Sequence, residues 1–327
     1  MPSFVAELVP VFFLIVLGAA LGKAGFLSAE GAGTLKKLVA SVALPAVLFG
    51  AFSRVRPDGA LLAISLAVFA ACALLGLAGA LAARAFRLPR PSTVFLFQGF
   101  EAGMLGYTLF AAFFGRSVVS AFATADLGQV VYVFTVLMAQ LLASEAGGGK
   151  VGGPVAGRVR PGRLLARLAS SPAILAIAAG LLASSLLPDA RGAPWGEGGF
   201  LLPLLDVVGS LTTPLVCLVV GYGLKDFRPR GAGNAIVMVV LRLAAASAVG
   251  AFLAFVLVPA LGYARINSIA LLALFVLPPP FIIPVFRSKG DDAAYLSAVL
   301  SIHTLISIAA FVILAAVAGA AGAARAP

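Results

Sequence analysis

An acidic residue inside an apolar stretch is the position in this sequence with the clearest chemical meaning. Glu101 lies in the run 92–114, and Gln98 precedes it by about one helical turn, so a helix would place both side chains on one face. A carboxylate at the centre of a membrane helix costs about 2.5–3.5 kcal/mol, and it therefore normally faces a cavity or a partner. Glu101 is a candidate proton carrier, a candidate sodium ligand together with Gln98, or a binder of a substrate cation. A structural acid that pairs with a buried base or with backbone donors is the alternative.

Two other titratable residues lie in apolar runs and are candidates for ion coupling. Asp126 and His303 each lie in the last run of their half of the chain, and an imidazole can gain a proton near neutral pH. The alternative for a lone histidine is a packing role with its hydrogen bonds satisfied. Arg242 is predicted to snorkel, with its charge at the nearer, cytoplasmic membrane surface; the alternatives are that it pairs with an acid or attracts an anionic substrate.

Three consecutive prolines and a group of glycines are expected to interrupt two of the apolar runs. Proline lacks an N–H and clashes with the preceding turn, so the stretch 278–280 cannot lie inside a helix. The glycines of the run 92–114 could give a matching break, because glycine accepts unusual backbone angles; the alternative is that they only allow close helix packing. Interrupted backbone at membrane depth is tolerated where it lines a cavity or is buried in protein. The predicted substrate site comprises Gln98, Gly99, Gly103, Gly106, Tyr107, Pro278, Pro279 and Pro280.

The composition indicates that membrane helices position these residues. Of the 327 residues, 62% are hydrophobic and 11% are charged, and the mean hydropathy is +1.12. A soluble domain carries about 25% charged residues, whereas a membrane helix needs about 20 mostly apolar residues. We therefore predict one all-helical, polytopic membrane domain without a soluble catalytic domain. Its ten expected spans are approximately 5–22, 35–53, 60–83, 92–114, 117–143, 171–187, 201–223, 234–258, 267–286 and 293–320.

The charged residues favour a membrane topology over a nucleic-acid site. The net charge is +11, but Lys and Arg are scattered through short loops and form no basic helix that could follow a phosphate backbone. Most of the 23 Lys and Arg residues lie in the loops after spans 1, 3, 5, 7 and 9. The positive-inside rule places these loops in the cytoplasm and both termini outside. We therefore expect a multi-pass protein of the cell membrane.

No sequence pattern indicates an enzyme or a bound metal. Cys72 and Cys217 lie within apolar runs, and His303 is the only histidine, so neither a disulfide framework nor a metal cluster is expected. The sequence contains no P-loop and no dinucleotide-binding fingerprint. We expect no cofactor apart from a coupling proton or sodium ion.

The two halves of the chain contain matching landmarks in the same order. Pro10 precedes Gly18 in the first span with the same spacing by which Pro172 precedes Gly180 in the sixth. Five spans in each unit would make the second copy inverted, which is a transporter architecture. The predicted parts are a five-helix repeat over 1–143, a cytoplasmic Gly-rich linker over 144–170 and an inverted five-helix repeat over 171–327.

The stretches 9–18 (VPVFFLIVLG), 42–49 (VALPAVLF) and 206–215 (DVVGSLTTPL) are similar to a known family. They resemble the auxin efflux carrier family of membrane transporters, within the bile-acid/auxin-carrier type of fold. The resemblance implies two inverted five-helix repeats, in which helices 4 and 9 are broken and cross near the membrane midplane beside the substrate site. The stretch 98–107 differs from the family pattern, because it lacks the Asn and the Gly-Pro pair found there and contains Glu101.

Together these features predict a secondary active transporter. It would move a small organic anion, such as a carboxylate, by alternating access, with an elevator-like movement of one helical domain against another that is coupled to protons. The alternatives are a sodium-coupled symporter of the bile-acid-symporter type, and a membrane ligand sensor or channel. The expected partners are the solute and the lipid bilayer, with no nucleic acid, and a homodimer is left open.

Overall fold

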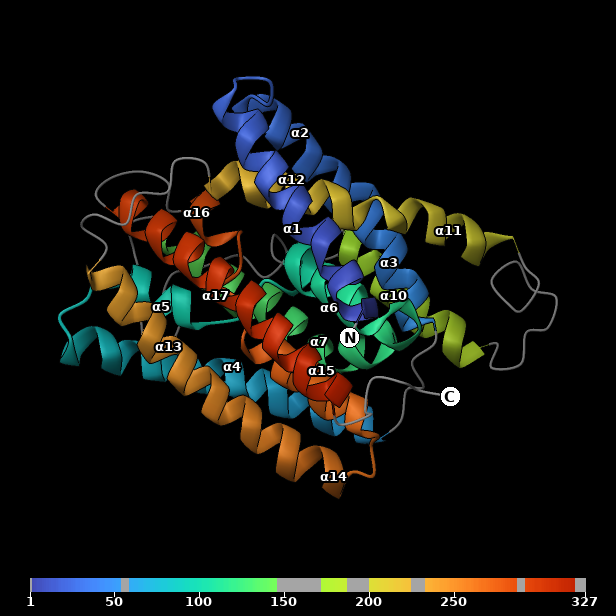
Figure 1. Ribbon diagram of the computed structural model, residues 1–327. Helices are drawn as coiled ribbons and strands as arrows, with labels where there is room; N and C mark the ends of the chain where they lie inside the picture. Colours follow the sequence, from blue (N-terminus) through green and yellow to red (C-terminus); the bar gives the residue numbers. More distant parts are fainter. Residues whose placement is uncertain are drawn as a thin grey trace.

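The chain is described by a computed structural model over residues 2–53, 59–145, 172–186, 200–224, 233–286 and 292–320, and this part is helical without strands (Figure 1). The first half contains α1 (Pro2–Lys23), α2 (Ala29–Leu38), η1 (Val39–Ala43), α3 (Leu44–Phe52), α4 (Gly59–Ala85), α5 (Ser92–Phe97), η2 (Ala102–Gly106), α6 (Tyr107–Phe114), η3 (Arg116–Val118), α7 (Val119–Tyr132), η4 (Val133–Leu137) and α8 (Met138–Glu145). The second half contains α10 (Pro172–Leu186), α11 (Leu201–Ser210), α12 (Thr212–Leu224), α13 (Gly233–Phe252), η5 (Leu253–Leu257), α14 (Val258–Ala260), α15 (Arg265–Phe275), α16 (Ile283–Phe286) and α17 (Asp292–Ala320).

Six helical stretches are long and apolar enough to cross a membrane, and this supports the predicted all-helical membrane fold. They are Ala29–Phe52, Gly59–Ala85, Val119–Leu141, Pro203–Gly223, Gly233–Ala260 and Tyr295–Gly319. Shorter apolar helices cover Phe13–Lys23, Pro172–Ser185 and Arg265–Phe275. The predicted linker 144–170 lies outside the described residues beyond Glu145, as do many of the loop residues that the topology prediction used.

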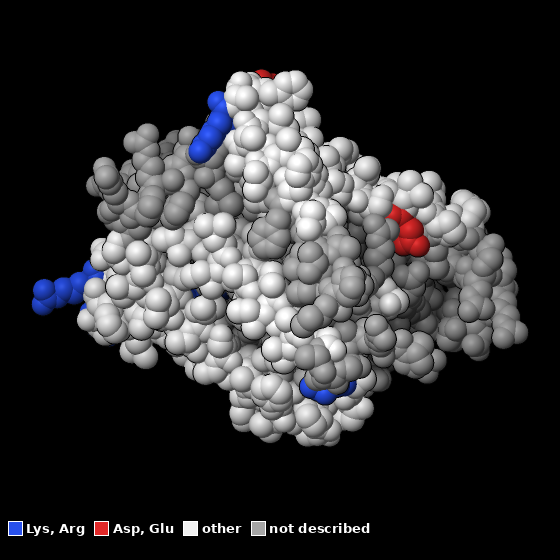
Figure 2. Space-filling model, viewed as in Figure 1, with Lys and Arg blue, Asp and Glu red and all other residues white. Residues whose placement is uncertain are grey.

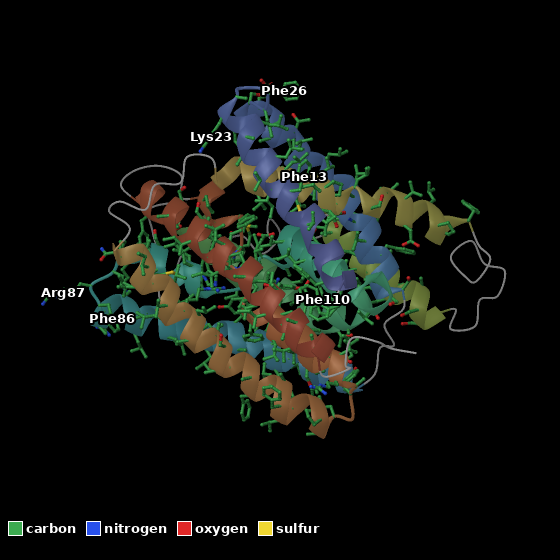
Figure 3. The ribbon with its side chains drawn as sticks, viewed as in Figure 1. Phe13, Lys23, Phe26, Phe86, Arg87 and Phe110 are labelled. Carbon is green, nitrogen blue, oxygen red and sulfur yellow. The ribbon has the colours of Figure 1, made fainter. Side chains whose placement is uncertain are left out.

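The outer surface of the helices is apolar, as lipid contact requires. Figure 3 shows Phe13, Phe26 and Phe86 pointing outward, and their side chains are exposed, whereas Phe110 is fully buried. On the face drawn in Figure 2, the Lys and Arg side chains of the described residues appear at only a few places near the margin. A water-soluble fold would keep such phenylalanines inside, so the exposed apolar surface agrees with a bilayer as the surrounding solvent.

The helices pack as two groups. In one group α1 packs on α12, and α3 packs on α10 and α11. In the other, α4 packs on α5, α7 and α13, while α13 also packs on α15 and α17. The groups occupy the upper right and lower left of Figure 1, and α6 contacts members of both. Helix α6 therefore lies at the boundary between the two groups.

Close packing inside the first group depends on two glycines. A Cβ atom added at Gly18 of α1 would lie 2.3 Å from the Leu218 carbonyl oxygen of α12, and one at Gly221 of α12 would lie 1.9 Å from the Ile15 carbonyl oxygen of α1. Only residues without a side chain allow two membrane helices to approach so closely. Gly18, whose spacing from Pro10 supports the predicted repeat, thus lies at the contact between α1 and α12.

Candidate functional site

Two of the predicted spans are interrupted in the structure. Helix α5 ends at Phe97, Gln98 is extended, and Gly99 has a positive φ of 68°, before the chain becomes helical again at Ala102. Helix α15 ends at Phe275, and residues 276–282, which include the three prolines, are not helical. We call the segments 98–101 and 276–282 together the crossing. Of the predicted break glycines, Gly103 and Gly106 lie in η2, so the prediction that they form the break is wrong and Gly99 alone provides it.

Hydrogen bonds join the two segments of the crossing. The Glu101 backbone N–H donates to the Pro278 carbonyl oxygen over 2.8 Å, and the Phe281 backbone N–H donates to the Glu101 side-chain Oε2 over 2.5 Å. Glu101 is only 8% exposed. Phe281 lies beyond the end of α15, so its N–H has no acceptor within that helix. The carboxyl group of Glu101 accepts this hydrogen bond instead. A Cβ at Gly99 would lie 3.1 Å from Pro280 Cγ, so the segments are also in close contact there.

Arg242 of α13 supplies a buried cation to the same crossing. Its Nε donates to the Leu96 carbonyl oxygen over 2.7 Å, Nη1 donates to that of Leu277 over 2.9 Å, and Nη2 donates to that of Gly99 over 2.6 Å. Its guanidinium carbon lies 5.0 Å from the centre of the Phe100 ring, and the residue has no exposed surface. The prediction that Arg242 snorkels is wrong. Carbonyl groups at the C-terminal ends of helices attract a positive charge, and two such ends meet at this guanidinium.

Polar side chains from α7 and α8 hold the first segment from the other side. The Tyr132 hydroxyl donates to Gln98 Oε1 over 2.7 Å, and Gln98 Nε2 donates to Gln140 Oε1 over 3.0 Å. Gln129 Oε1 accepts from the Phe100 backbone N–H over 3.1 Å, and its Nε2 donates to Asp126 Oδ1 over 2.9 Å.

The structure does not place all the predicted site residues together as the sequence led us to expect. Gln98 and Glu101 do not lie on one helical face, because the chain is extended between them. Asp126 is connected to the crossing through Gln129, a residue outside the predicted site. The predicted site omits Tyr132, Gln129 and Gln140, because membrane helices commonly contain such isolated polar side chains and their spacing does not reveal their partners.

His303 of α17 also reaches the crossing. Its Nε2 lies 3.5 Å from Arg242 Nη1, and the side chain has no exposed surface. A guanidinium can only donate, so Nε2 can act here only as the acceptor. Its Nδ1 has no hydrogen-bond partner within the described part of the chain. Of the three predicted coupling residues, Glu101 therefore lies within the crossing, whereas His303 is connected to it through Arg242 and Asp126 through Gln129.

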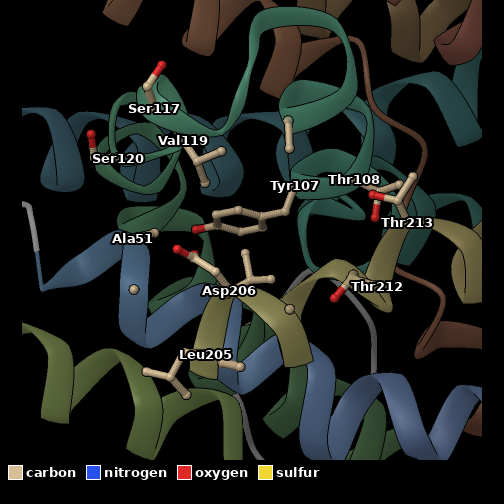
Figure 4. A pocket seen from close by; sticks show the side chains of 15 residues that line it. Ala51, Tyr107, Thr108, Ser117, Val119, Ser120, Leu205, Asp206, Thr212 and Thr213 are labelled. Carbon is tan, nitrogen blue, oxygen red and sulfur yellow. The ribbon is translucent and has the colours of Figure 1, made fainter. Parts of the chain in front are cut away.

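A pocket of about 60 Å³ lies at the boundary between the two helix groups (Figure 4). Figure 4 shows Tyr107 reaching across it, with Asp206 on one side and Thr108, Thr212 and Thr213 nearby. Tyr107 belongs to the predicted site, and it stacks edge-on against Phe122. The lining residues are Ala46, Val47, Gly50, Ala51, Tyr107, Thr108, Ala111, Ser117, Val119, Ser120, Leu205, Asp206, Gly209, Thr212 and Thr213.

The pocket residues from α11 and α12 are ones that our site prediction missed. A signal for them existed, because Asp206, Thr212 and Thr213 lie in the stretch 206–215 that supports the family resemblance. The described residues contain no group of three or more His, Cys, Asp or Glu side chains that could hold a metal ion. Cys72 and Cys217 are both buried and free.

The family comparison agrees with this architecture. Residues 3–153 match the family described as membrane transport protein. No curated protein matches the chain. The matched region contains α1 to α8, and with them the first broken span and Glu101. With its helical, lipid-facing fold, the protein is a multi-pass membrane protein. Its residues 3–153, a little under half of the chain, match the membrane transport protein family, which confirms the resemblance to auxin efflux carriers.

Proposed function

We propose that the protein is a secondary active transporter that moves a small organic anion by alternating access. The observation that carries this proposal is the crossing, in which two broken helices meet at a buried carboxyl group and a buried guanidinium. Broken helices at the membrane midplane provide the ion and substrate sites of many secondary transporters. The pocket at Tyr107 lies between two helix groups, as an elevator-like movement of one group against the other would require.

An inverted repeat of ten spans is part of the proposal, and the helix contacts support it. If the chain is divided into two five-span units, several of the main contacts have a counterpart in which the two units exchange roles. These counterparts are α1 on α12 with α10 on α3, α4 on α7 with α13 on α17, α4 on α5 with α13 on α15, and α15 on α7 with α17 on α6. Two units over 1–143 and 171–327, with both termini outside the cell membrane, would account for this pattern.

The pocket chemistry supports a small polar solute. Hydroxyl groups from Tyr107, Thr108, Thr212 and Thr213 surround it, and α12 begins at Thr212. A helix N-terminus has a partial positive charge and free N–H groups, so it favours a carboxylate. Asp206 is also in the lining, and it would favour a solute that carries a hydrogen-bond donor as well. A volume of about 60 Å³ means that the two helix groups would separate to admit an organic acid.

Proton coupling is assigned to Glu101, with Asp126 and His303 as further candidates. Protonation of Glu101 would weaken its bond from the Phe281 N–H, because a bond to a charged carboxylate is stronger than one to a neutral group. A proton at Glu101 would thereby loosen the contact between the two segments of the crossing. A sodium-coupled symporter, a ligand sensor and a channel are the competing functions that the experiment must separate.

The test is uptake of carboxylates by liposomes that contain the purified protein, with and without a pH gradient. We expect saturable uptake that responds to the gradient, and we expect the Glu101→Gln variant to lose this response. Glu30→Gln is the matched control, because Glu30 lies in α2 far along the chain from the crossing and its variant should behave as the wild type. A Glu101→Gln variant with unchanged pH response would refute the coupling role. Sodium-dependent uptake would indicate a symporter, and unsaturable flux that follows voltage would indicate a channel.

A further inference from the structure

We propose that Arg242 acts as a tethered cation, which occupies the place where the crossing would otherwise bind a free sodium ion. The inference rests on the proposed function in one respect, namely that the crossing is the moving, ion-coupled centre of a transporter. It adds a specific residue and a specific consequence: coupling at this crossing does not need sodium, because the positive charge is part of the chain.

The first argument is the geometry of the carbonyl groups. Leu96 and Gly99 belong to the end of α5 and the residues after it, and Leu277 follows the end of α15. All three carbonyl oxygens point at one guanidinium, at 2.6–2.9 Å from its nitrogen atoms. Unwound carbonyls and the C-terminal ends of half-helices are the groups that coordinate sodium in transporters with broken helices. In this chain these groups bind Arg242.

The second argument concerns the side-chain oxygens that could bind sodium. Gln98 Oε1 accepts from the Tyr132 hydroxyl, and Glu101 Oε2 accepts from the Phe281 backbone N–H. A sodium ion at either atom would compete with an existing donor, and it would place a second positive charge near the guanidinium. Each of these two oxygen atoms thus already accepts a hydrogen bond from a donor of the protein.

The third argument is the connection that the tether creates. Arg242 belongs to α13, whereas the carbonyls that it binds belong to the breaks after α5 and α15. A free ion could leave and allow these elements to separate, but a covalently attached cation keeps them together. Helix α13 and the crossing therefore move as one unit in any transport step, which is consistent with the packing of α13 on both α4 and α15.

The experiment replaces the tethered cation by a diffusible one. Arg242→Ala removes the guanidinium and leaves a space of its shape at the three carbonyls. We expect guanidinium ion at millimolar concentration to raise the thermal unfolding temperature of this variant and to leave the wild type unchanged. Urea is planar and donates similar hydrogen bonds but is uncharged, so it should have little effect. Arg265→Ala is the matched control, because Arg265 is exposed at the start of α15 and its loss should create no response to guanidinium.

Transport gives a second, independent measurement. Charged donors contribute strongly to buried hydrogen bonds, so we expect Arg242→Ala to lower uptake by at least about tenfold and guanidinium to restore part of it. Arg242→Lys, which keeps the charge but lacks the planar fork, should retain more activity than Arg242→Ala. The proposal is overturned if the folded Arg242→Ala variant does not respond to guanidinium, or if urea stabilises it equally. Stabilisation by guanidinium without any measurable uptake in the wild type would support the tethered cation and reject the transporter function.

Discussion

At both breaks of the crossing, backbone N–H groups lack the acceptors that a continuous helix would provide. The two breaks meet this need in different ways. In the segment 276–282, three prolines remove the N–H groups that a helix would need, so few donors remain to be satisfied. In the segment 98–101, the donors are present and must find partners: the Phe100 N–H binds Gln129, and the Glu101 N–H binds Pro278. The proline break is built into the local sequence, whereas the glycine break depends on residues elsewhere in the chain.

This difference separates the two breaks in their tolerance to mutation. The glycine break requires a positive φ at one residue and several side chains from α7 and α8. The proline break keeps its backbone even when one outside contact is lost, because no helix can form through consecutive prolines. We therefore expect substitutions that affect the segment 98–101 to be more damaging than equivalent ones that affect the segment 276–282.

The largest effect is expected for Gly99→Ala. At a φ of 68° an alanine costs roughly 1–2 kcal/mol, and its Cβ would lie 2.5 Å from Val133 Cγ2, which adds roughly 1–3 kcal/mol of overpacking. The measurement is the thermal unfolding temperature of the purified protein in detergent, together with its yield as a monodisperse species.

Gly103→Ala is the control for this prediction. Gly103 lies in η2, and the nearest atom to an added Cβ is the end of the Leu44 side chain at 3.2 Å, which can shift. We expect a much smaller loss of stability. Equal losses for the two variants would mean that the break does not depend on the conformation of Gly99.

The same difference explains which features could be predicted from the sequence. The break at Pro278–Pro280 was predicted correctly, because proline acts on its own backbone. The break in the run 92–114 was predicted, but two of its three glycines were wrong, since glycine permits a break without requiring one. The role of Arg242 was missed, because its acceptors Leu96, Gly99 and Leu277 are carbonyl groups, and sequence patterns do not show where carbonyls lack a partner.

Tyr132→Phe is expected to have an intermediate effect. It removes the hydroxyl that donates to Gln98 Oε1 and leaves this buried oxygen without that donor, at a cost of about 1–3 kcal/mol. The ring and its edge-on contact with Phe69 remain, so the change tests the hydrogen bond alone. We expect a lower unfolding temperature and greater protease cleavage of the folded protein. An unchanged stability would show that Gln98 is held by its bond to Gln140 without help from Tyr132.

Ser307→Ala is the corresponding deletion at the proline break, and it should have the smallest effect. The Ser307 hydroxyl donates to the Val276 carbonyl oxygen over 2.7 Å, and its alternative acceptor is the His303 carbonyl oxygen over 2.8 Å. Losing it should cost about 0.5–1.5 kcal/mol, as for an ordinary hydrogen bond. The Val276 carbonyl is only partly buried, and the prolines that follow hold the backbone. The measurement is again the unfolding temperature, compared directly with Tyr132→Phe. A larger loss for Ser307→Ala than for Tyr132→Phe would reverse the comparison, because the proline break would then depend more on outside contacts than the glycine break does.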